Sequence, residues 1–278
     1  MQKDRECLPT SAHIGYYGVV VSGDDVMLKV PAPPPEFGVS ANNLLRALRP
    51  EDLALLKPHL EPRRPDRGAV LHEAGDLVEF AHFPCGGALA SYVVVLSSGA
   101  SVETALIGRE GAIGGIVSQG HLPAYSQAVV ILGGEFLRIE LAALEEAKSR
   151  SLTLRHLFAR YADCLLAQIF QSVACNAAHR IEQRAVKWLL TAMEHSGDHE
   201  VSLTQEQLAS MLGVGRSYVS RVIQLLKHQE VLATRRGGLI VRDMEKLLSL
   251  SCDCPDAVRR HFDEVLKGVY PVPVAIAS

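Results

Sequence analysis

Near residue 141, the spacing of apolar residues changes from short runs separated by turns to a helical repeat. Before this point, runs rich in Val, Ile, Leu and aromatic residues alternate with turn signals such as Gly133-Gly134. The runs are Ala69–His72, Glu79–Phe83, Ser91–Leu96, Ser101–Ile107, Gln127–Leu132 and Glu135–Glu140. Short strands at this regular spacing predict an antiparallel sandwich or barrel, and we expect a jelly roll. Gly133-Gly134 predicts a two-residue hairpin between the last two runs.

A long helix is predicted after the strands, from about Leu152 to Ala178. Its first apolar stripe recurs at alternating steps of three and four, and consists of Leu154, Phe158, Tyr161, Leu165, Gln168 and Ser172. A second stripe lies on the other side and consists of Leu157, Leu166, Ile169, Phe170 and Val173. A helix that is apolar on two faces needs two partners, so we expect its own domain and a second copy of the chain. The first stripe is our candidate dimer face, and the alternative is a core helix of a larger domain.

Composition narrows the class of protein. The 278 residues, 48% hydrophobic and 21% charged, are typical of a globular chain of one or two domains. No apolar signal-peptide core opens the sequence and no apolar run is long enough to span a bilayer, so we expect a cytoplasmic protein without membrane contact. The six cysteines are dispersed, which argues against a disulfide framework. Cys252-x-Cys254 could bind a metal or sense redox, but two thiolates alone complete no tetrahedral site, so we predict no metal and no cofactor.

Residues 180–250 carry the clearest functional pattern. Although the chain has a net charge of −3, residues 179–250 hold 10 Lys and Arg against 8 Asp and Glu. Thr204, followed three residues later by Gln207, predicts a capping box that opens a helix over Gln205–Leu212. Gly213-Val214-Gly215 then predicts a turn, and a second helix follows from about Arg216 to His228.

The second helix has basic and hydroxyl residues at its exposed start, as a helix that enters the DNA major groove does. We expect four residues to meet base edges: Arg216, Ser217, Ser220 and Arg221. Arginine suits this role because its planar fork can pair bidentately with guanine. The alternative is that these arginines are ordinary solvated charges.

Two short strands around Arg235-Arg236-Gly237-Gly238 predict a wing after the second helix. Phosphate contacts position a protein on DNA but do not read the sequence. We expect them from Thr204, Gln205, Tyr218, Arg235 and Arg236.

The sequence resembles the Crp/Fnr superfamily of transcription regulators over about residues 41–250. The resemblance rests on Thr204-Gln205-Glu206-x-Leu208-Ala209-x-x-Leu212-Gly213-x-x-Arg216-x-x-Val219-Ser220-Arg221 and on Gly237-x-Leu239-Ile240-Val241. It implies an α+β architecture with a cyclic-nucleotide-binding-like β jelly roll, a long dimerisation helix and a C-terminal winged helix-turn-helix. It also implies a homodimer on a palindromic double-stranded DNA operator, with RNA polymerase as a further partner.

Within this resemblance, Arg216 and Arg221 take the positions of two arginines that contact operator guanines. Ser217 stands where a glutamate is common, so the half-site should differ at that base pair. We divide the chain into a poorly ordered extension (1–40), a jelly roll (41–147), a dimerisation helix (148–179), the winged helix-turn-helix (180–250) and a tail (251–278).

The cyclic-nucleotide cassette of the family lacks its charged residues here. Gly115 stands where a glutamate would bind the ribose, and no Arg or Lys occurs between Arg109 and Arg138. Burying a phosphate without a cationic partner is unfavourable, so we expect an effector that is not a cyclic nucleotide. The candidate effector pocket comprises Gly114, Gly115, Ser126 and Gln127.

Three alternatives stay open. A cyclic-nucleotide- or redox-responsive regulator could use haem at His72, His82 or His121, or a switch at Cys164 and Cys175. A cupin-like metal enzyme needs clustered His and Glu, but no His-x-His pair followed by Glu occurs in residues 62–141, so we expect no enzyme. A sensing module that binds only protein partners is the third.

Overall fold

The computed structural model describes residues 38–99, 101–116, 122–196, 200–201, 203–235 and 238–266. Residues 1–37 of the predicted extension lie outside this part, and so do 267–278 of the predicted tail. The described chain begins with a short 3-10 helix, η1 (Val39–Ala41), and two helices, α1 (Asn43–Arg46) and α2 (Pro50–Leu56). Pro50 occupies the first turn of α2, where its missing N–H leaves no bond unmade.

Asn42 fixes this N-terminal segment to the jelly roll. Its buried side chain accepts a hydrogen bond from the Leu45 N–H and donates to the carbonyl oxygens of Pro84 and Gly111 at 2.8 and 2.9 Å. A second 3-10 helix, η2 (Lys57–His59), leads from α2 into the first strand.

The jelly roll consists of two antiparallel sheets. One has the strand order β1-β7-β3 and is formed by β1 (Glu61–Arg63), β7 (Phe136–Glu140) and β3 (Phe80–Pro84). The other has the order β2-β6-β4-β5 and is formed by β2 (Val70–His72), β6 (Gln127–Leu132), β4 (Leu89–Val95) and β5 (Ser101–Ile107). A core of Ala and β-branched side chains with Phe136 fills the space between the sheets. All six predicted strands are confirmed, whereas the polar strand β1 was missed.

The predicted hairpin at Gly133-Gly134 is wrong. The strands on either side of it, β6 and β7, belong to different sheets, so the two glycines carry the chain across the sandwich. Close approach explains why glycines stand there: a Cβ on Gly134 would lie 3.1 Å from the Ala88 Cβ, and one on Gly133 would lie 3.3 Å from the Pro65 carbonyl oxygen.

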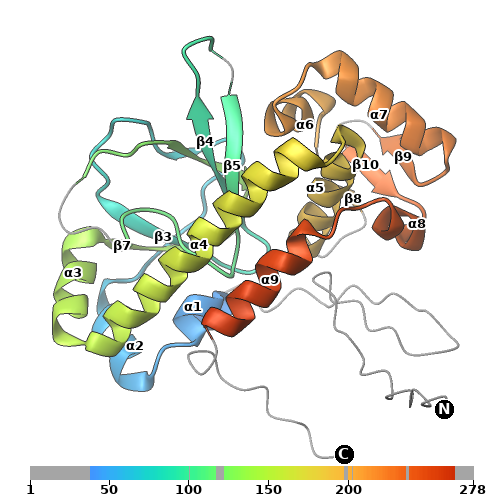
Figure 1. Cartoon of the computed structure of the whole chain (residues 1–278). Helices are drawn as coiled ribbons and strands as arrows, with labels where there is room; N and C mark the ends of the chain where they lie inside the picture. Colours follow the sequence, from blue (N-terminus) through green and yellow to red (C-terminus); the bar gives the residue numbers. More distant parts are fainter. Residues whose placement is uncertain are drawn as a thin grey trace, which may run out of the picture.

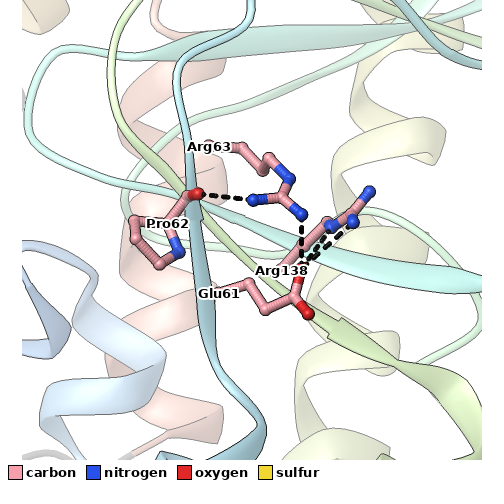
Figure 2. A network of polar contacts seen from close by, with 4 residues as sticks. All are labelled: Glu61, Pro62, Arg63 and Arg138. Carbon is pink, nitrogen blue, oxygen red and sulfur yellow. Dashed lines mark hydrogen bonds and ion pairs between the residues drawn. The ribbon is translucent and has the colours of Figure 1, made fainter.

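An ionic network connects β1 to β7 (Figure 2). Glu61 and Arg138 are cross-strand partners, and the Arg138 Nη2 lies 3.0 Å from the Glu61 Oε2, which also accepts from Arg63 at 2.6 Å. The Arg138 guanidinium also lies over the Phe80 ring, 4.1 Å from its centroid. Cross-strand charge pairs of this kind support the register of a short edge strand.

Helix α3 (Leu141–Arg150) leads into α4 (Leu152–Ala178), which crosses the molecule diagonally beside the jelly roll (Figure 1). The bounds of α4 are those predicted, and the Ser151 hydroxyl caps its start by accepting from the Leu154 N–H. The Tyr161 hydroxyl accepts from the Ala112 N–H at 3.0 Å and donates to the Ala112 carbonyl oxygen at 3.1 Å, which fixes α4 to the jelly roll.

The candidate dimer face on α4 needs correction. Leu154, Phe158 and Tyr161 are at most 1% exposed, because they already pack into the core of their own chain. Three residues of the second stripe stay exposed, Leu166 at 47% and both Phe170 and Val173 at 64%, and so does Leu152 at the start of the helix. Two faces of α4 are therefore apolar, as predicted. Of the residues assigned to the dimer face, Leu154, Phe158 and Tyr161 are covered by their own chain, whereas Leu165, Gln168 and Ser172 are half-buried.

The C-terminal domain follows a break at His179. It contains α5 (Ile181–Ser196), β8 (Glu200–Val201), α6 (Gln205–Leu212), α7 (Arg216–His228), β9 (Leu232–Arg235), β10 (Gly238–Val241) and α8 (Met244–Ser249). Its three strands form a small sheet in the order β8-β10-β9. The predicted tail contains one more helix, α9 (Cys254–Val265), which returns to run alongside α4 (Figure 1). Within the described residues, no helix combines the length and apolar character that crossing a bilayer requires.

Candidate nucleic-acid interface

Helix α6 and the turn after it are built as the sequence predicts. The Thr204 side chain accepts from the Gln207 N–H, and the Gln207 side chain accepts from the Thr204 N–H, so the capping box is complete. Gly213 ends the helix in the left-handed conformation, with φ 66°, and donates its N–H to the carbonyl oxygen of Ser210. This turn sets the angle at which α7 leaves α6.

Helix α7 has one buried and one exposed face. Its buried stripe is the predicted one and comprises Val219, Val222, Ile223 and Leu226. Arg216, Ser217 and Arg221 are exposed, whereas Ser220 is half-buried. The helix lies at the edge of the molecule, where its N-terminal end is open to solvent (Figure 1).

Neither arginine of α7 is held by an ion pair within the part of the chain that the structure describes. The Arg221 guanidinium lies 5.0 Å from the centroid of the Tyr218 ring, a cation–π arrangement that orients it without neutralising its charge. The Tyr218 hydroxyl in turn lies 3.5 Å from the Glu182 Oε1 on α5. Both guanidinium groups can therefore meet an external acceptor.

The predicted phosphate contacts are distributed around α7. Thr204 is exposed but its hydroxyl takes part in the capping box, and Gln205 beside it is half-buried. Arg235 is exposed at the end of β9, next to the wing tip. Arg236 lies outside the described residues.

The C-terminal domain rests on the jelly roll through α6 and α5. Helix α6 packs against β5, and Leu89 and Ile131 of the jelly roll belong to the same apolar core as α5 and α6. Glu103 of β5 faces this interface, and its Oε2 is buried without a hydrogen-bond partner among the described residues. Burial raises the pKa of Glu103 to about 7, against the opposing effect of the nearby Lys187 ammonium on α5.

The candidate effector pocket is assembled only in part. Gly114, Gly115 and Ser126 line one hollow, whereas the Gln127 side chain points elsewhere and donates to the Glu73 Oε2 at 2.6 Å. No arginine or lysine lines this hollow among the residues that the structure describes.

Gly114 has a structural reason to be a glycine. Its φ is 106°, and a Cβ there would lie 2.4 Å from the Phe80 carbonyl oxygen. Its N–H donates to the Tyr92 hydroxyl at 3.0 Å, so this amide is already occupied and is not free for a phosphate oxygen. The geometry explains the glycine without an effector.

Two of the histidines considered for haem, His72 and His82, line the same hollow. Burial lowers the pKa of His82 to about 4, and its backbone N–H and carbonyl both pair with Ile113. Burial also lowers the pKa of His72, whose ring lies 6.2 Å from that of Tyr92. His121 lies outside the described residues.

One group of side chains was missed by sequence reasoning. Cys252-x-Cys254 lies beside Cys175 and His179, which come from the end of α4. The spacing Cys-x₃-His at a helix end, together with a distant Cys-x-Cys, is the signal that could have suggested it. Cys164 is buried elsewhere on α4 and takes no part in this group.

Comparisons with known proteins agree with this geometry. Residues 183–250 match the family model of the Crp-like helix-turn-helix domain. No sequence among curated proteins matches the chain.

Solved structures share the fold over most of the chain. FixK2 from Bradyrhizobium japonicum is 14% identical with a TM-score of 0.57, covering 69% of this chain and 98% of that one. CLP, a c-di-GMP-responsive global regulator from Xanthomonas campestris, is 15% identical with a TM-score of 0.57, covering 70% and 100%. A putative regulator of the Crp/Fnr family from Eubacterium rectale is 16% identical with a TM-score of 0.56, covering 74% and 96%. The chain thus carries a Crp-like helix-turn-helix domain and has the architecture of the Crp/Fnr family of transcription regulators.

Proposed function

We propose that this protein is a homodimeric, sequence-specific transcription regulator that binds a palindromic DNA operator through α7. The observation that carries the proposal is the exposed, unneutralised pair Arg216 and Arg221 on the first turns of a helix whose opposite face is buried. Such a helix can enter the major groove with its N-terminal residues at the base edges. We also propose RNA polymerase as a partner, and this part of the proposal rests only on the resemblance to the Crp/Fnr superfamily.

The spacing of the two arginines suits the reading of two base pairs. Five residues along an α-helix correspond to a rise of about 7.5 Å. Two base-pair steps of DNA, at about 3.4 Å per step, have a similar length. Each guanidinium can pair bidentately with a guanine, and such a pair discriminates by about 1–3 kcal/mol.

We place the dimer interface on the exposed stripe of α4. Leu166, Phe170 and Val173 are separated by four and three residues, which is the repeat of a helix–helix seam. Phe170→Glu should convert the dimer to a monomer in light scattering, because it puts a charge into each side of the seam. Leu77→Glu is the control, since Leu77 is also exposed but lines a hollow of the jelly roll to which no residue of α4 contributes. A Phe170→Glu protein that stays dimeric would overturn this interface.

We also propose that the effector of this protein is not a cyclic nucleotide. The support is the lack of a cation among the described residues of the hollow and the occupied amide of Gly114. We expect added cyclic AMP or cyclic GMP to leave the affinity for DNA unchanged.

The experiment that tests DNA reading begins with selection of bound duplexes from random DNA, followed by fluorescence anisotropy on the selected and on a random sequence. Arg221→Ala should weaken binding to the selected operator about 5- to 150-fold and relax the preference at one base pair. Arg260→Ala is the matched control, because it removes the same charge from an exposed position on α9, away from α7.

Two results would contradict the proposal. One is equal loss of affinity for selected and random DNA in Arg221→Ala, which indicates a phosphate contact only. The other is a selection that yields no common sequence from protein that binds DNA with a normal salt dependence.

A further inference from the structure

Four potential metal ligands come together where α4 ends and α9 begins. This cysteine–histidine cluster consists of Cys175, His179, Cys252 and Cys254. One ligand atom from each residue lies within 4.8 Å of all the others. The three cysteines are buried and the histidine is half-buried.

The backbone arranges two of the ligands on one side of the cluster. Cys175 lies in the last turn of α4 and His179 caps that helix, with its N–H donating to the Cys175 carbonyl oxygen at 3.0 Å. Residues four apart lie on the same face of a helix, so both side chains point the same way.

The other two ligands come from the segment that follows the winged domain. Cys252 lies between α8 and α9, and Cys254 is the first residue of α9. Because α9 packs alongside α4, this segment is held against the end of α4 (Figure 1).

The distances in the cluster are those of ligands around a single ion. The Cys175 Sγ lies 3.8 Å from the Cys252 Sγ, and the Cys254 Sγ lies 3.4 Å from the His179 Nδ1. Tetrahedral zinc, with bonds of about 2.3 Å to sulfur and about 2.0–2.1 Å to nitrogen, separates two sulfurs by about 3.8 Å and a sulfur from a nitrogen by about 3.5 Å.

Ordinary packing does not account for the cluster. Cys175, Cys252 and Cys254 form a buried group of their own that contains no aliphatic or aromatic core residue. A disulfide between Cys175 and Cys252 would need their sulfurs about 2 Å apart and would leave Cys254 and His179 without a role. An iron–sulfur cluster has several irons, so its ligands surround a larger volume than a single ion does.

Two neighbouring side chains are placed as outer-shell partners. The Gln171 Nε2 lies 3.1 Å from the Cys254 Sγ, and the Lys187 Nζ on α5 lies 3.6 Å from the Cys175 Sγ. Zinc with three thiolates and a neutral histidine carries a net charge of −1, which the Lys187 ammonium offsets. Outer-shell donors of this kind orient the ligands of metal sites.

We propose that the cysteine–histidine cluster binds one zinc ion in a closed, structural Cys₃His site. Soft thiolates with one imidazole in a tetrahedral arrangement favour zinc over hard cations such as magnesium. All four positions are supplied by protein, so no position is open for a substrate. The ion would fasten the segment after the winged domain to the end of α4, beside the break at His179 where α5 begins.

The test uses the full chain, purified reduced and without chelators from cells grown with both zinc and iron. Elemental analysis of wild-type protein should give about one zinc per chain. Cys252→Ser and Cys254→Ser should lose it. Cys164→Ser is the matched control, because Cys164 is a buried cysteine of α4 outside the cluster and its loss should leave the zinc in place.

Two further measurements keep the test informative if a cysteine variant unfolds. Titration of Co²⁺ into metal-free wild-type protein should produce the visible bands of tetrahedral cobalt and a thiolate-to-cobalt charge-transfer band. His179→Cys should retain zinc and intensify the charge-transfer band, because it converts the ligand set to four thiolates.

Several results would overturn the proposal. Folded, reduced wild-type protein that takes up neither zinc nor cobalt is one of them, and iron with inorganic sulfide in place of zinc is another. Metal that is retained by the folded Cys252→Ser variant would be bound outside the cysteine–histidine cluster. The cupin-like alternative requires such a site in the jelly roll. Equal loss of zinc from Cys164→Ser would show that the metal depends on general stability of the fold.

Discussion

Replacing Glu103 by glutamine should stabilise the protein at neutral and alkaline pH but not at acidic pH. Glu103 lies on β5 at the interface with the C-terminal domain, and one of its carboxylate oxygens has no hydrogen-bond partner among the described residues. An ionised carboxylate in such a place is unfavourable, and burial raises the pKa of Glu103 from 4.5 to about 7. Glutamine resembles the protonated form and does not titrate.

The sign of the effect follows from proton binding. Between about pH 4.5 and pH 7, the unfolded chain has released this proton and the folded chain retains it, so the stability of the wild type falls as pH rises. Below pH 4.5 the contribution is fully present, and above pH 7 it has been lost. A tenfold change in proton affinity corresponds to about 1.4 kcal/mol, so the whole effect is about 3 kcal/mol.

Urea unfolding of both proteins at several pH values between 4.5 and 8 measures this difference. The stability of Glu103→Gln relative to wild type should rise by about 3 kcal/mol across the series. Glu146→Gln is the control on the exposed face of α3, and it should change the stability by less than about 0.5 kcal/mol at every pH. A difference between Glu103→Gln and wild type that does not change with pH would refute the reasoning.

Two other substitutions test α7 and the packing of α4. Ser217→Glu should shift the selected half-site toward cytosine at one base pair, because a carboxylate accepts a hydrogen bond from cytosine N4. Parallel selections from random DNA with the wild type and the variant measure this shift. An unchanged selected sequence would place residue 217 outside the major groove. Tyr161→Phe should destabilise the fold by about 1–3 kcal/mol in urea unfolding, because the hydroxyl serves both the N–H and the carbonyl of buried Ala112. A loss below about 0.5 kcal/mol would show that these two backbone groups find other partners.

Local signals in the sequence were sufficient for most elements. The approximate bounds predicted for α4 and α7 agree with the observed ones, because their apolar stripes follow the helical period. The capping box of α6 was also predicted from two residues, Thr204 and Gln207, whose side chains act within one turn. In each case the residues that decide the structure are neighbours in the chain.

Features that depend on distant contacts were not predictable in this way. Gly133-Gly134 has the sequence of a hairpin, but the partners that exclude side chains there are Ala88 and Pro65, far away in the chain. Both faces of α4 carry apolar residues, and only the packing of the jelly roll decides which of them stay exposed. The cysteine–histidine cluster was missed for the same reason, because its two pairs of ligands are separated by more than 70 residues.

The placement of α7 relative to the α4 seam depends on a chain of such distant contacts. The Gln168 Nε2 on α4 donates to the Leu106 carbonyl oxygen of β5 at 2.6 Å, and β5 in turn carries α6. Helix α6 packs against α7, so in the proposed dimer a shift at any of these contacts would move the arginines of both copies relative to the dimer axis. Because a symmetric dimer reads half-sites about 34–36 Å apart, the half-site spacing of the selected operator measures that placement directly.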